Sequence, residues 1–176
     1  MDEINDKGGV YYDRDDYAGL LKRIIIAVVD LLVILIVMII VVSLSRMFMS
    51  NEEDLAKVIF ISFISISLFY LAILKPSKYR TLGYIMADVK IVNLKGNKPS
   101  LFTMLLRASL LLIGPFELIF DIIWLTSETT KQTLRDKYVG TYVVNRNALP
   151  TGKGPLRNVT LGVLGWYLTY QEVKIP

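Results

Sequence analysis

The sequence contains no cysteine and no histidine. Without cysteine, the chain can form neither disulfides nor thiolate metal sites. Cysteine usage therefore does not indicate whether the protein resides in an oxidising or a reducing compartment. Without histidine, it lacks the commonest general base and metal ligand, so hydrolytic triads and zinc sites are not expected. No motif pairs a nucleophile with a base. We therefore expect no enzymatic activity, no metal site and no cofactor.

Polar residues are also scarce. Hydrophobic residues make up 53% of the chain, and the mean hydropathy is +0.49. Values this high are typical of a membrane protein rather than a soluble one. We therefore expect the lipid bilayer as a partner. The net charge of +4 is modest, and we expect no nucleic acid as a partner.

The longest hydrophobic run extends from Ile24 to Leu44 and is interrupted by one charge, Asp30. A helix over this run would be about 31 Å long, close to the ~30 Å hydrocarbon core of a bilayer, so we predict a transmembrane helix. A carboxylate inside such a helix costs roughly 2.5–3.5 kcal/mol, and Asp30 should therefore face protein, water or a partner charge. Arg23 lies two helical turns earlier on the same face.

Two further apolar runs follow. The run 55–74 comes after a short polar turn at 45–54, which predicts an antiparallel helical hairpin. The run 101–126 carries Gly114-Pro115 at its centre, and proline interrupts a helix, so two half-helices are expected at 101–113 and 116–126. The predicted fold class is an all-α membrane protein with two transmembrane helices, a Gly-Pro-broken third hydrophobic helix and short cytoplasmic β-strands.

The distribution of Lys and Arg predicts the orientation. The linker 75–100 and the tail beyond residue 126 are rich in Lys and Arg, whereas the turn 45–54 has one arginine and three acids. The positive-inside rule therefore places the linker, and with it the N-terminus, in the cytoplasm. The alternating segment 89–92, followed by a turn at 95–97, predicts a short strand, and 140–144 can form a second one beside it.

The basic tail leaves two interpretations of the third apolar run. If this run enters the membrane and returns, or lies along the inner surface, both termini are cytoplasmic and the two strands can pair. If it is a kinked full span, the tail lies outside.

Two terminal segments flank the expected transmembrane domain at 20–145. Residues 1–19 form a polar leader without apolar periodicity, which we expect to be mobile or to lie on the membrane surface. Tyr11, Tyr12 and Tyr17 would then sit at the headgroup level or in a solvated tail. The leader is not a signal peptide, because its acidic start lacks a basic region. The extension 146–176 contains an aromatic segment at 161–170, which is too short to span and is expected at the interface.

Four features occur in order along the chain. They are Arg23 seven residues before Asp30, Thr81-Leu82-Gly83 before 89–92, Arg107 in Leu105-Leu106-Arg107, and Asp136 before Gly140-Thr141-Tyr142-Val143-Val144. Together they resemble the RDD family of small integral membrane proteins over about 18–145. The resemblance implies that Arg23, Asp30 and Asp136 are the family's arginine and two aspartates. Tyr84 and Ala87 depart from the family, which usually has Lys and often Gly there. The adjacent residues Arg14-Asp15-Asp16 spell the same letters but do not correspond to the family's three residues, which are far apart in the sequence.

The resemblance implies a transporter, and for some members a cation/proton antiporter. In this hypothesis Asp30, Arg107, Glu117 and Asp121 form an ion pathway for a monovalent cation and a proton, since buried carboxylates can exchange the two. Two spans are few for a pathway, so homo-oligomers would be needed.

The second hypothesis is a membrane scaffold or accessory subunit, bound to a partner protein, in which the buried charges are structural. Arg23 and Arg107 would neutralise Asp30 and Asp121, and Asp136 would pair with a base at the cytoplasmic surface. For Asp30 we predict Arg107 as the partner.

Overall fold

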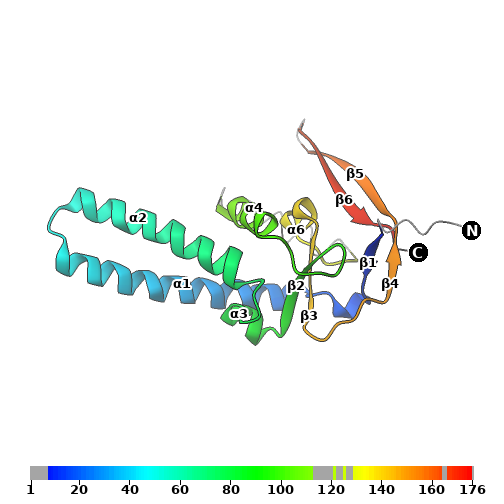
Figure 1. The fold of residues 1–176 in the computed structure, drawn as a ribbon, viewed down its shortest axis with the longest axis horizontal. Coiled ribbons are helices and arrows are strands. Elements are labelled where there is room, and N and C mark those ends of the chain that lie inside the picture. The colour runs from blue at the N-terminus through cyan, green and yellow to red at the C-terminus, as the bar shows by residue number, and fades with distance from the viewer. Residues whose placement is uncertain (1–7, 113–120, 122–124, 126–128, 164–165, 176) are drawn as a thin grey trace, which may run out of the picture.

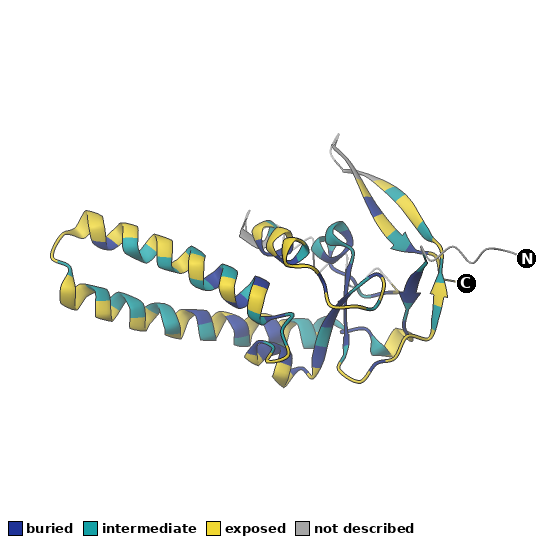
Figure 2. Ribbon diagram, viewed as in Figure 1, coloured by how far each residue is buried: buried dark blue, intermediate teal, exposed yellow. Residues whose placement is uncertain are grey.

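A long helical hairpin projects from a smaller cap of short strands and helices (Figure 1). The computed structural model describes residues 8–112, 121, 125, 129–163 and 166–175. We call residues 8–19, 75–100 and 129–175 the cap. Buried residues concentrate in the cap and at its junction with the hairpin (Figure 2).

The hairpin consists of α1 (Leu20–Phe48) and α2 (Glu52–Leu68), and α2 continues as η2 (Phe69–Leu74). Both helices are long and apolar enough to cross a membrane, and they contain the two predicted spans. Asn51 caps α2 by accepting a hydrogen bond from the backbone N–H of Glu53. Large apolar side chains along α1 and α2 are exposed. A soluble monomer rarely exposes so large an apolar surface, which a bilayer would cover.

The segment η2 is a π-helix. The backbone N–H of Lys75 bonds to the carbonyl of Tyr70, five residues earlier, at 3.2 Å. This wider turn brings residues five apart to one face, which an ordinary α-helix does not. Tyr70 and Lys75 therefore both face α1.

The centre of the cap is a two-stranded sheet. Strand β2 (Val89–Asn93) follows the short helix α3 (Leu82–Met86), and β3 (Thr141–Asn145) follows α6 (Leu134–Val139). The strands are antiparallel, with Ile91 opposite Val143. The predicted pairing of these two strands is therefore confirmed.

The helix α4 (Leu101–Leu112) corresponds to the first predicted half-helix. Its exposed face carries Leu101, Phe102, Leu105 and Leu106, while Met104, Arg107 and Ala108 are buried. Gly114, Pro115, Glu117 and most of 116–126 lie outside the described residues.

One apolar core joins the hairpin to the cap. It is built from α1, η2, α3, β2, α4 and β3. Its buried members are Ala18, Ile26, Ala72, Tyr84, Ala87, Val89, Ile91, Met104, Ala108 and Val143.

The leader was expected to be mobile or on the membrane surface, and this is wrong for residues 9–18. Strand β1 (Gly9–Tyr11) pairs with β4 (Gly152–Gly154), and a 3-10 turn, η1 (Arg14–Asp16), follows. Tyr12 and Tyr17 do not reach a headgroup layer. They are buried against each other and against Tyr142, with ring centroids 5.5–6.4 Å apart.

The aromatic segment at 161–170 falls on two paired strands, and its expected place at the membrane interface stays a prediction. Strands β5 (Leu156–Val163) and β6 (Trp166–Val173) are antiparallel, with Leu156 opposite Val173. Together with β1–β4, they make the all-α description too narrow, and that class is not confirmed.

Candidate functional site

Asp30 is buried on α1 where the hairpin meets the cap, with 4% of its surface exposed. Four donors surround its carboxylate. They are Lys75 Nζ (2.9 Å to Oδ2), the Tyr70 hydroxyl (3.1 Å to Oδ1), Thr81 Oγ1 (3.2 Å to Oδ2) and the Gly83 backbone N–H (3.0 Å to Oδ1). The carboxylate is thus neutralised and hydrogen-bonded, as a buried charge requires.

Glycine at position 83 permits this close approach. A Cβ at Gly83 would lie 2.6 Å from Oδ1 of Asp30 and 2.7 Å from the carbonyl oxygen of Ile26. Thr81 caps α3 by accepting from the backbone N–H of Tyr84, which directs the start of α3 toward α1. The Thr-x-Gly motif therefore packs the linker against Asp30.

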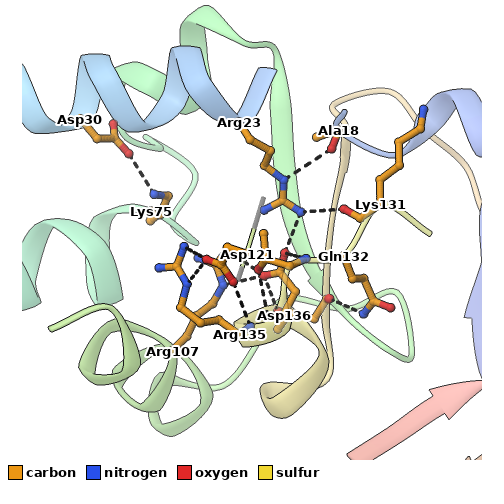
Figure 3. A network of polar contacts seen from close by, with 12 residues as sticks. Ala18, Arg23, Asp30, Lys75, Arg107, Asp121, Lys131, Gln132, Arg135 and Asp136 are labelled. Carbon is orange, nitrogen blue, oxygen red and sulfur yellow. Dashed lines mark hydrogen bonds and ion pairs between the residues drawn. The ribbon is translucent and has the colours of Figure 1, made fainter. Parts of the chain in front are cut away.

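The predicted pairing of Asp30 with Arg107 is wrong. The cation beside Asp30 is Lys75 (Figure 3). Arg23 does not neutralise Asp30 either, because it contacts Asp136 instead. In the sequence Lys75 is one of several basic residues of the linker, and no periodic pattern marks it as the partner of Asp30.

Lys75 is itself buried, with 9% of its surface exposed, and its ammonium lies 4.7 Å from the centre of the Tyr84 ring. Burial lowers the pKa of Lys75 to about 8, and Asp30 offsets only part of this effect. The positive charge of Arg107 lowers the pKa further. Lys75 can therefore lose its proton near neutral pH.

Asp136 forms a second charge cluster. It is fully buried in the first turn of α6, where it forms a capping box with Thr133. Its Oδ2 lies 2.6 Å from Nη2 of Arg23, and its Oδ1 lies 2.8 Å from Nε and 2.7 Å from Nη2 of Arg107 (Figure 3). Thr141 Oγ1 donates a further bond of 3.3 Å. Asp136 thus links α1, α4, α6 and β3.

The environment of Asp136 differs from the predicted one. We expected it at a polar surface, but none of its surface is exposed. Burial alone would raise the pKa of Asp136, yet the guanidinium groups of Arg107 and Arg23 outweigh burial and hold the pKa well below its usual range. This carboxylate stays ionised at any physiological pH.

Asp121 is buried and pairs with Arg135 of α6, whose Nε donates a bond of 2.6 Å. The expected neutralisation of Asp121 by Arg23 or Arg107 is therefore not observed. Glu117 lies outside the described residues.

Tyr84 fills the space between the two charge clusters. It is almost fully buried, and among the described residues its hydroxyl has no hydrogen-bond partner. Burial raises the pKa of Tyr84. Its ring contacts the ammonium of Lys75. The family usually has a lysine at position 84. In this chain the position holds a tyrosine, whose ring contacts Lys75 from the end of η2.

A comparison with protein-family models matches the RDD family over residues 17–140, a segment that contains Asp30, Lys75 and Asp136. No curated protein and no solved structure is significantly similar to the chain.

Proposed function

Because the chain belongs to the RDD family and has two helices that could cross a bilayer, we propose that it is a protein of the cell membrane that exchanges a monovalent cation for a proton at Asp30. The observation that carries this proposal is the identity of the cation beside each buried aspartate. Asp30 pairs with a lysine, and Asp136 pairs with two arginines. Lysine can lose its proton in a buried site, whereas arginine cannot. Only the first pair can switch.

The groups around Lys75 suit a small hard cation. The hydroxyl oxygens of Tyr70 and Thr81 lie within hydrogen-bond distance of the Asp30 carboxylate. Hard cations prefer oxygen ligands of this kind. When Lys75 is protonated, its ammonium occupies this position. When Lys75 is neutral, the carboxylate of Asp30 can bind a cation in place of the ammonium.

The exchange conserves charge. Lys75 releases one proton to water, and one monovalent cation takes the place of the ammonium beside Asp30. The reverse step restores the ion pair. The charged and titratable groups facing Lys75 are Asp30 on α1, Tyr70 on η2, Tyr84 on α3, Arg107 on α4 and Arg135 on α6.

The proposed orientation places both termini in the cytoplasm. Strands β2 and β3 pair directly, which supports an arrangement with the segments 89–93 and 141–145 on one side of the membrane. A full crossing between them would separate them. In the proposed arrangement the third apolar run makes no full crossing, and the Lys/Arg-rich cap favours the cytoplasm as the side of the strands. Two spans are few for a pathway, and we expect protomers to associate.

The proposal is tested with purified protein in liposomes, by following proton movement driven by sodium or potassium gradients. Wild-type protein should exchange the cation for protons. Asp30→Asn should abolish exchange per folded molecule, even though the loss of the partner of Lys75 lowers its stability. Asp136→Asn should lower the yield of folded protein and spare exchange per folded molecule. Equal exchange by Asp30→Asn and wild type would refute the site.

A scaffold is the second candidate, supported by the Asp136 cluster. This one carboxylate joins a transmembrane helix to α4, α6 and the cap sheet. The charges would then only fix the shape of a surface for a membrane partner protein. Absence of exchange by folded wild-type protein between mildly acidic and alkaline pH would favour this function.

A further inference from the structure

A small cavity lies where η2, α4 and α6 meet, beside the two charge clusters. Its volume is about 20 Å³, enough for one water-sized group. The lining residues are Leu71, Lys75, Met104, Arg107, Ala108 and Arg135. Three cationic side chains from three different elements therefore converge on a space with one apolar wall.

Arg107 and Lys75 keep donors available to an anion, and Arg135 is held beside the cavity by its ion pair with Asp121. Arg107 uses Nε and Nη2 for one oxygen of Asp136, and its Nη1 has no partner within the described part of the chain. Lys75 donates one hydrogen bond, to Asp30. Burial is the main cause of the lowered pKa of Lys75, and Arg107 and Arg135 lower it further because like charges around the cavity repel. An anionic oxygen there would reduce this repulsion.

The surroundings of the cavity indicate where the anion comes from. Phe69 and Ile73 of η2 and Phe102 and Leu105 of α4 are exposed apolar side chains on two of the helices that line the cavity. The cavity also lies at the end of a candidate membrane span, where lipid headgroups are located. Basic pockets between helices at this level are suited to anionic headgroups.

We propose that this cavity binds the phosphate of an anionic membrane lipid. One phosphate oxygen enters the cavity toward Lys75, Arg107 and Arg135, and the acyl chains lie on the apolar faces of η2 and α4. The site does not depend on cation exchange and would exist in a scaffold as well. Free phosphate offers the same chemistry, and the experiment separates the two sources.

The test uses the absence of cysteine in the chain. Ala108→Cys replaces a small side chain on the cavity wall with a thiol. Ser109→Cys places a thiol on the exposed face of the same helix. Both variants are purified in mild detergent and labelled with a small thiol reagent. Phosphatidylglycerol, or phosphatidylcholine with the same acyl chains, is added before labelling.

Phosphatidylglycerol should slow the labelling of Ala108→Cys roughly tenfold at about ten times its dissociation constant, relative to phosphatidylcholine. Ser109→Cys should react equally fast in both lipids. Arg135→Gln in the Ala108→Cys background should lose most of the protection.

Three results would overturn the assignment. They are equal rates for Ala108→Cys in the two lipids, equal slowing of Ser109→Cys, and full protection in the Arg135→Gln background. If inorganic phosphate without lipid gives the full protection, the site binds free phosphate and the lipid assignment is wrong. Labelling requires no flux measurement, so it is independent of the exchange assay.

Discussion

Lys75 lies 2.9 Å from Asp30, and both side chains are buried although they are 45 positions apart in the sequence. The contact joins α1 to the end of the helix formed by α2 and η2. It is the point where the hairpin, the linker and the charge network meet.

The Asp30–Lys75 pair should be energetically coupled. Removing one partner leaves an uncompensated buried charge and should cost roughly 3–5 kcal/mol of stability. Asp30→Asn and Lys75→Gln should therefore each lower the melting temperature in detergent, and the double variant should be milder than the sum of the two.

The control cycle combines Asp30→Asn with Arg107→Gln, which share no bond among the contacts described above. Arg107 lies near Lys75 but does not bond to Asp30, so the coupling in this cycle should be smaller than that between Asp30 and Lys75. Coupling of Asp30 to Arg107 that exceeds its coupling to Lys75 would contradict the observed pairing.

Asp136→Asn should destabilise the protein by about 3–5 kcal/mol, because Arg23 and Arg107 both lose their anion. The matched control is Asp88→Asn, since the Asp88 side chain is 62% exposed and lies 3.7 Å from Arg80. It should change stability by less than about 0.5 kcal/mol. A similar loss for both variants in thermal unfolding would show that Asp136 has no special role.

The lowered pKa of Asp136 predicts how the stability of the protein depends on pH. The folded-state pKa of this carboxylate is lowered, so the stability it contributes is present above the unfolded-state pKa of about 4 and is lost as the pH falls below that value. The stability difference between wild type and Asp136→Asn should therefore narrow only below about pH 4. Narrowing between pH 7 and 5 would contradict this pKa.

Gly83→Ala should destabilise the junction by about 1–3 kcal/mol, because the new methyl group would overlap Asp30 and the backbone of Ile26. Gly19→Ala is the matched control, since the nearest atom to its Cβ is 3.9 Å away. Thermal unfolding of both variants is the measurement. Equal melting temperatures for Gly83→Ala and wild type would mean that α3 does not pack on α1 as described.

Single cysteines test the orientation. Asn51 and Asn147 are exposed, and they lie in the α1–α2 turn and after β3, respectively. An impermeant thiol reagent added to whole cells should label Asn51→Cys and not Asn147→Cys. Labelling of both from outside would contradict a cytoplasmic cap.

The sequence was sufficient to predict the helical hairpin and the β2–β3 pair, because hydrophobic length and strand alternation are local signals. It did not predict the partners of Asp30 and Asp136. Those depend on a π-turn that directs Lys75 toward α1 and on the burial of α6, and neither leaves a periodic pattern. The leader was misjudged for a similar reason, since Val10 and Tyr12 are buried only by the distant strand β4 and the core around Tyr142.

The measurement that tests the central claim most directly is proton release when purified protein binds sodium in weakly buffered detergent solution, repeated with potassium. Lys75 holds its proton below a pKa of about 8, so each bound cation should release about one proton near pH 7 and almost none above pH 9. Lys75→Arg should abolish both binding and release, and Lys78→Arg, at an exposed lysine in the same linker, should behave as wild type. Proton release that persists in Lys75→Arg, or that does not decline above pH 8, would contradict exchange at the Asp30–Lys75 pair.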